Sequence, residues 1–209
     1  MEKIYQMANK WIVIVQLPIF LVMVFFPKTL LSIFGEEFTN GTQALIIMAI
    51  ANLIKVGTGM GGIIIDMTGY TKLKLVNSII RLVIFITLDL LLIPKWGIVG
   101  AAVAILVGEG GINILRLLQV YVIYKILPFN KSFYKPILAT VVGAIVVLVA
   151  GRFLPYESNY ILAGLNMLLM MLSYAGIILL LGFTKDELSL YHALTANIKN
   201  KFNQSFRGR

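Results

Sequence analysis

The 209-residue chain contains no cysteine and a single histidine, His192. Without cysteine it has neither a disulfide framework nor a thiolate metal site. One imidazole is too few for most histidine-based metal binding or acid–base chemistry. The composition therefore predicts no metal and no cofactor.

Charged residues are also scarce, at 13% of the chain, whereas 59% of the residues are hydrophobic. The mean hydropathy is +0.92, far above the value that a soluble core requires. Because one transmembrane helix needs about 20 mostly apolar residues, the chain has enough apolar residues for about six of them. These values exclude a water-soluble globular enzyme.

Enzyme motifs are missing as well. No second histidine or serine–histidine pair lies in the apolar part of the chain, and no aspartate cluster is available to bind Mg²⁺. A Gly-Lys-Ser/Thr phosphate loop is also absent. We therefore expect a protein without catalytic activity.

Six apolar runs separated by short polar breaks predict an all-α polytopic membrane protein. Since no long soluble insertion separates them, we expect one membrane domain over residues 1–183. Its spans are predicted at about 11–26, 44–65, 75–93, 98–121, 137–154 and 160–181.

Residues 184–209 have a different pattern. Thr184 and Glu187 have the spacing of a capping box, and apolar residues then recur every three or four positions. We expect a basic amphipathic helix on the cytoplasmic membrane surface, next to anionic lipid headgroups. The alternative is a solvated tail.

The 18 basic residues outnumber the nine acidic ones, which gives a formal charge of +9. In a membrane protein this excess reports topology, because Lys and Arg are retained on the cytoplasmic side; we therefore expect no nucleic-acid partner. If the N-terminus is inside, the outer loops carry only Lys28, Lys95 and Arg152. The inner loops and tails then carry Lys3, Lys10, Lys72, Lys74, Lys125, Lys131, Lys135, Lys185, Lys199, Lys201, Arg207 and Arg209. Both termini are predicted to be cytoplasmic.

Five charged residues remain inside the predicted spans: Lys55, Arg81, Asp89, Glu109 and Arg116. Each isolated charge near the bilayer centre costs roughly 2.5 to 3.5 kcal/mol, so these residues must be paired, must snorkel, or must face a wet cavity. Lys55 and Glu109 fall near the middle of their spans and either pair or share one water-filled level. Arg81 and Arg116 lie in the inner halves of their spans, and Asp89 in an outer half.

Helix geometry relates these charges to one another. Glu109 and Arg116 are seven residues apart, so they share a helix face but are about 10 Å apart along the axis, too far to bond directly. The preceding span can present Arg81 beside them. One interpretation is a hydrophilic pathway whose cations suit a phosphate-bearing substrate. The other is a set of structural ion pairs with snorkelling arginines.

Glycines cluster beside two of these charges. Gly57, Gly59, Gly61 and Gly62 follow Lys55, and further glycines flank Glu109. Small residues allow helices to approach closely, and clustered glycine beside an intramembrane charge can also interrupt a helix at a transport site. Both outcomes stay open at this point.

Three stretches resemble one known family. They are LPIFLVMVFFPKTLLSIFGEEFTNG at 17–41, GGIIIDMTGYTKLKLVNSIIRLVIFITLDLLLIPKWGIVGAAVA at 61–104, and the basic loop at 125–135 followed by two apolar spans. Their order is similar to that in the C-terminal part of polysaccharide biosynthesis proteins. These are the lipid-linked oligosaccharide flippases of the multidrug/oligosaccharidyl-lipid/polysaccharide (MOP) superfamily.

The resemblance implies export across the cytoplasmic membrane of a prokaryote. The cargo would be a lipid carrier that bears a sugar chain through a pyrophosphate, turned over by alternating access between two helical lobes. The partners it implies are membrane lipid, the lipid-linked glycan and an N-terminal half that supplies the first lobe. Two alternatives remain: a fragment of a MATE-like antiporter in which Glu109 binds Na⁺ or H⁺, or a non-transporting membrane scaffold of a glycan-assembly complex.

Overall fold

The computed structural model describes residues 2–59, 61–130, 133–153 and 160–181. Throughout these ranges the secondary structure is helical, with no strand, so the predicted all-α fold is confirmed. The long helices are α1 (Glu2–Phe25), α3 (Thr42–Gly57), α5 (Thr71–Trp96), α6 (Ile98–Tyr124), α7 (Tyr134–Phe153) and α8 (Tyr160–Leu180). The short ones are α2 (Pro27–Ser32), the 3₁₀ helix η1 (Glu36–Gly41) and α4 (Gly61–Met67). The tail helix expected over 184–209 lies outside the described residues.

Within the described ranges, five helices are long and apolar enough to cross a membrane: α1, α5, α6, α7 and α8. A sixth span results if the segment 36–57 and α4 are taken together, although the two are bent by 47° at the break between them. The chain is thus a polytopic membrane protein. The span predicted at 44–65 consists of two helices, one of the two outcomes that the glycine cluster left open, because the backbone after Thr58 leaves the helical region at Gly59, where φ is +80°.

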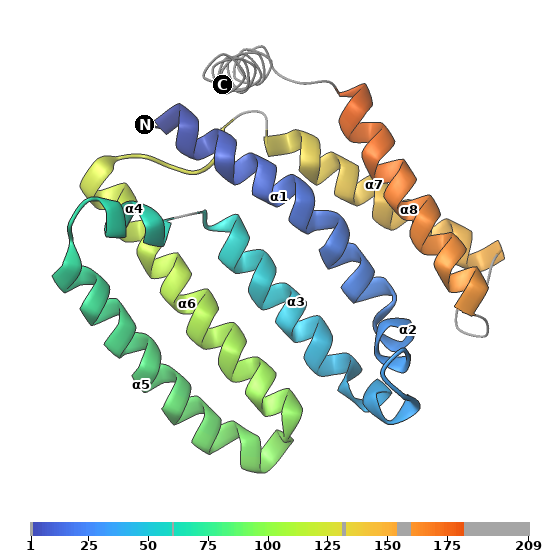
Figure 1. The fold of residues 1–209 in the computed structure, drawn as a ribbon, viewed down its shortest axis with the longest axis horizontal. Coiled ribbons are helices and arrows are strands. Elements are labelled where there is room, and N and C mark those ends of the chain that lie inside the picture. The colour runs from blue at the N-terminus through green and yellow to red at the C-terminus, as the bar shows by residue number, and fades with distance from the viewer. Residues whose placement is uncertain (1, 60, 131–132, 154–159, 182–209) are drawn as a thin grey trace, which may run out of the picture.

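The long helices lie side by side in a row (Figure 1), in the order α5, α6, α3, α1, α7, α8. Each contacts chiefly its neighbours in this row, and α4 packs across the ends of α5 and α6. Two apolar clusters join α1 to α7 and α8: one contains Val13, Leu17 and Tyr174, the other Leu21 and Met170. Helix α5 lies at one edge of the row. In its 18-residue apolar stretch 6% of the residues are buried, against 39% in that of α6.

A close antiparallel turn joins α5 and α6. Gly97 ends α5 with φ 55° and ψ −130°, a conformation in practice restricted to glycine. Three residues on, a Cβ on Gly100 would collide with the carbonyl group of Leu92. The two glycines therefore allow the backbones of α5 and α6 to touch at the turn, which brings their charged residues into register farther along.

Candidate functional site

The polar residues of α6 gather on one of its faces. Glu109, Asn113 and Arg116 follow one another at four and three residues, so they lie within about 60° around the helix axis. The opposite side carries the exposed apolar residues Val107, Ile114 and Leu118. This division directs the polar groups of α6 away from its apolar outer stripe.

The charged residues Arg81 and Glu109 form an ion pair between α5 and α6. Nη1 of Arg81 donates to Oε1 of Glu109 at 3.0 Å. On α6 itself, Nδ2 of Asn113 donates to the backbone oxygen of Glu109 at 2.7 Å and to its Oε2 at 3.4 Å. The Glu109 carboxylate is therefore held from two helices, and its partner is Arg81 rather than Lys55.

Two uncharged amides join the same helices, about one turn from Arg81 along α5 and nearly three turns from Glu109 along α6. Asn77 on α5 donates to Gln119 on α6 at 2.7 Å, and Gln119 donates back at 2.9 Å. Asn77 is 1% exposed. This reciprocal pair fixes the register between α5 and α6, since amides that hydrogen-bond to each other can lie in an apolar contact at little cost.

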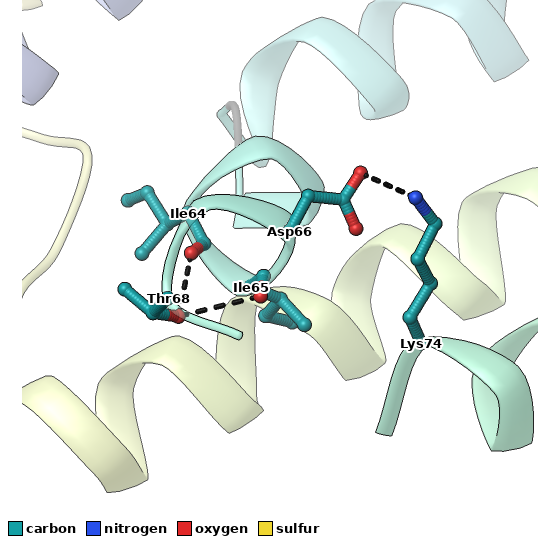
Figure 2. Close-up of polar contacts among 5 residues, drawn as sticks. All are labelled: Ile64, Ile65, Asp66, Thr68 and Lys74. Atoms are coloured by element: carbon teal, nitrogen blue, oxygen red, sulfur yellow. Dashed lines mark hydrogen bonds and ion pairs between the residues drawn. The ribbon is translucent and has the colours of Figure 1, made fainter. Parts of the chain in front are cut away.

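A pocket opens beside the amide pair, where α4 packs on α5 and α6. Its volume is about 200 Å³, and it is lined by Gly62, Ile63, Ile65, Asp66, Lys74, Asn77 and Arg116. Nζ of Lys74 donates to Oδ2 of Asp66 at 3.0 Å, which ties α5 to α4 (Figure 2). Nearby, Thr68 closes the last turn of α4 by donating to the carbonyl oxygens of Ile64 and Ile65 (Figure 2).

We call these residues of α4, α5 and α6 the polar seam: Asp66, Lys74, Asn77, Arg81, Glu109, Asn113, Arg116 and Gln119. The seam contains three of the five candidate site residues, Arg81, Glu109 and Arg116. It runs along roughly 10 Å of α5 between Lys74 and Arg81. It therefore forms one continuous polar region at the edge of an otherwise apolar row.

The other two candidates lie apart from the seam. Lys55 is in the last turn of α3 and exposed. Asp89 is on α5, eight residues beyond Arg81, and partly exposed. Neither forms an ion pair within the described part of the chain, and the structure does not bring Lys55 to Glu109.

Charge alone does not identify the amides of the seam, because Asn77, Asn113 and Gln119 are uncharged. Asn77 lies four residues before Arg81, and Asn113 four residues after Glu109, so each amide shares a helix face with a charge. That spacing was the available signal. Asp66 and Lys74 had none, because the predicted spans placed them in a loop.

No group of three or more His, Asp or Glu side chains that could hold a metal ion occurs in the ranges the structure describes. The site's polar atoms are instead guanidinium, ammonium, carboxylate and amide groups. Such a set recognises anions, or pairs with itself, more readily than it binds metal cations.

The fold and the seam together define a polytopic membrane protein with charged groups between its helices. Comparisons of the chain with models of protein families, with curated proteins and with solved structures found no match.

Proposed function

We propose that the chain is a membrane-embedded portion of an exporter for a lipid-linked oligosaccharide or polysaccharide precursor, acting in the cytoplasmic membrane together with a second helical half. The Arg81–Glu109 pair carries this proposal. Its side chains are 44% and 21% exposed although both belong to helices long and apolar enough to span a bilayer. Exposed charge in lipid is costly, so this surface suits a hydrated pathway or a second protein half better than hydrocarbon.

The position of the pair in the row supports the same conclusion. Helix α5 lies at one edge of the row, and the rest of the chain buries few residues of its apolar stretch. In an exporter with two lobes, the face where Arg81 meets Glu109 would border the path between them. The resemblance to lipid-linked oligosaccharide flippases in the stretches at 17–41 and 61–104 supplies the cargo class.

The antiporter alternative is weaker on this geometry. The Glu109 carboxylate accepts from Arg81 and Asn113, so Na⁺ or H⁺ would have to compete with a guanidinium that is already paired with it. The guanidinium neutralises the charge that a cation would need. In the scaffold alternative the chain transports nothing and the same ion pair is purely structural, so the test must separate a structural role of the pair from a role in export.

The test is a charge exchange in cells that express the chain with its companion half. Surface glycan and the amount of chain in the membrane are measured for Arg81→Gln, Glu109→Gln and the exchanged double variant Arg81→Glu/Glu109→Arg. We expect the exchange to restore the amount of chain in the membrane, because the ion pair is re-formed. Export should stay at least about tenfold below that of the parent chain, the loss expected when a charge-assisted contact to the cargo is removed. Lys95→Gln, which removes an exposed cation at the end of α5, serves as the control and should export normally.

Full export by the exchanged variant would mean that the ion pair is purely structural. If the exchanged variant exports as well as the parent chain, the pair acts only through its contribution to packing. Normal export by both single variants would also overturn the proposal, because the pathway would then not require either charge.

A further inference from the structure

The pocket beside α4 contains a cation, Arg116, that pairs with none of the described residues. Within the described ranges, the Arg116 guanidinium makes no hydrogen bond or ion pair. It lies over Gly62: a Cβ built there would be 3.5 Å from Nη1 and 3.7 Å from Cδ of Arg116. Arg116 is partly exposed where it lines the pocket, so the five donors of its guanidinium are accessible from the pocket. The side chain is therefore arranged for a ligand that accepts hydrogen bonds.

The second cation of the pocket is held by an exchangeable partner. Lys74 pairs with Asp66, but their side chains are 54% and 44% exposed, and such solvent-exposed pairs contribute little stability. Asp66 comes from the short helix α4 and Lys74 from the first turns of α5 (Figure 2), and both side chains line the pocket. An anion that enters the pocket could take the place of the Asp66 carboxylate.

The size and lining of the pocket limit the ligand. About 200 Å³ is several times the volume that one water requires. Two cations and one acid line it, together with the Asn77 amide. Arginine binds phosphate through paired donors, and lysine acts on it as a point charge. A phosphate group matches this combination.

From these observations we propose that the α4–α5–α6 pocket binds the phosphate group of an anionic membrane lipid, with Arg116 and Lys74 as its ligands and Asp66 as a resident competitor. Lys74 lies about 5 Å from the start of α5, and Arg116 about 12 Å from the end of α6. Both distances fall within the headgroup region and the adjacent part of the bilayer. The inference goes beyond glycan export, because an ordinary phospholipid can occupy the site whether or not the chain transports anything.

The test uses the full purified chain in dodecyl maltoside micelles, which contain no phosphate. Phosphatidylglycerol is titrated in one arm and inorganic phosphate in the other. Native mass spectrometry counts retained lipid, and thermal unfolding reports binding of either probe. We expect phosphatidylglycerol to bind and to raise the unfolding temperature, with an affinity about tenfold or more lower for Arg116→Gln and for Lys74→Gln. Lys95→Gln, a matched loss of one exposed cation, should bind as the parent chain does.

Asp66→Asn gives the decisive readout. Because it removes the competitor while keeping the size of the side chain, it should tighten binding several-fold, a gain that misfolding cannot produce. Stabilisation by inorganic phosphate as well would support a general phosphate site, whereas stabilisation by phosphatidylglycerol alone would support a lipid site. Weaker binding by Asp66→Asn, equal binding by Arg116→Gln and Lys95→Gln, or no effect of either probe would overturn the proposal. Since no export is measured, failure here would not bear on the exporter proposal.

Discussion

Gly59 lies in the break between α3 and α4 and has a conformation that favours glycine. Its φ is +80°, and a Cβ on it would lie 2.6 Å from Oη of Tyr5 and 2.8 Å from Cβ of Pro128. Gly57, two residues earlier, ends α3 and has nothing within 4 Å of the corresponding position. Two neighbouring glycines of one cluster therefore have different roles, and only Gly59 is required by its surroundings.

We expect Gly59→Ala to lower the free energy of unfolding by at least about 1–2 kcal/mol, the cost of a left-handed conformation for a residue with a Cβ, with the collision against Tyr5 added to it. Gly57→Ala should cause no loss, because the helix and its surroundings accept a methyl group. Thermal or denaturant unfolding of the purified variants in micelles measures both. Equal stability of the two variants would contradict the assigned role of Gly59.

The charged side chains show how far single residues can be interpreted from sequence. Depth and polarity identified Arg81, Glu109 and Arg116 as groups that need an explanation, because a charge in an apolar span is costly wherever it points. Their ion-pair partners could not be assigned from depth. Depth placed Glu109 level with Lys55 and Arg81 nearer the cytoplasmic side, whereas the register of α5 against α6 pairs Glu109 with Arg81.

Helices α5 and α6 approach each other closely at more than one position along their length. Near the middle of α6, a Cβ on Gly108 would lie 3.1–3.3 Å from three ring atoms of Phe85 on α5. Gly111, one turn later, has open space at the same atom. Both residues are helical, so replacing either with alanine gives a similar gain in helix propensity.

The difference between the two substitutions therefore isolates the contact between α5 and α6. We expect Gly108→Ala to destabilise the protein by about 1–3 kcal/mol, the usual cost of overpacking, while Gly111→Ala is neutral or stabilises it by up to about 1 kcal/mol. Unfolding of the two variants in the same detergent measures this difference. A Gly108→Ala variant as stable as Gly111→Ala would mean that Phe85 moves aside freely.

α1 shows why hydropathy misplaces helix ends. The first apolar run predicted a span from about residue 11, whereas α1 begins at Glu2. Asn9 and Lys10, which mark the polar side of that predicted boundary, are 1% and 3% exposed. A helix continues as long as its backbone hydrogen bonds are made, so its length can exceed the apolar stretch that identifies it.

For the molecule as a whole, the row of helices places successive connections at opposite ends. Helix α2 and the turn between α5 and α6 lie at one end, and the start of α5 and the end of α6 lie at the end where α1 begins (Figure 1). The first end therefore carries the exposed residues Lys28 and Lys95, and the second end carries the exposed residues Lys72 and Lys125. The excess of basic residues predicts that the end with Lys72 and Lys125 is cytoplasmic. The absence of cysteine makes this simple to test, because every introduced thiol is the only one in the chain.

Single variants Lys28→Cys, Lys95→Cys, Lys72→Cys and Lys125→Cys should divide into two pairs. We expect a membrane-impermeant maleimide added to intact cells to label the first two, and the second two to react only after permeabilisation. Labelling is measured on the purified chain against its total amount. If all four thiols reacted in intact cells, the alternating topology would be wrong.

The sequence by itself determined the class of the protein, the approximate positions of its apolar helices and the charged residues that needed an explanation. These follow from quantities that add up along the chain: the transfer of apolar side chains to the bilayer, and the cost of each charge placed there. Only the tertiary structure decided that the second predicted span breaks at Gly59, that Glu109 pairs with Arg81, and that Arg116, Lys74 and Asp66 surround one pocket. Those features depend on the register between helices and on the contacts of residues distant in sequence, which no local pattern contains.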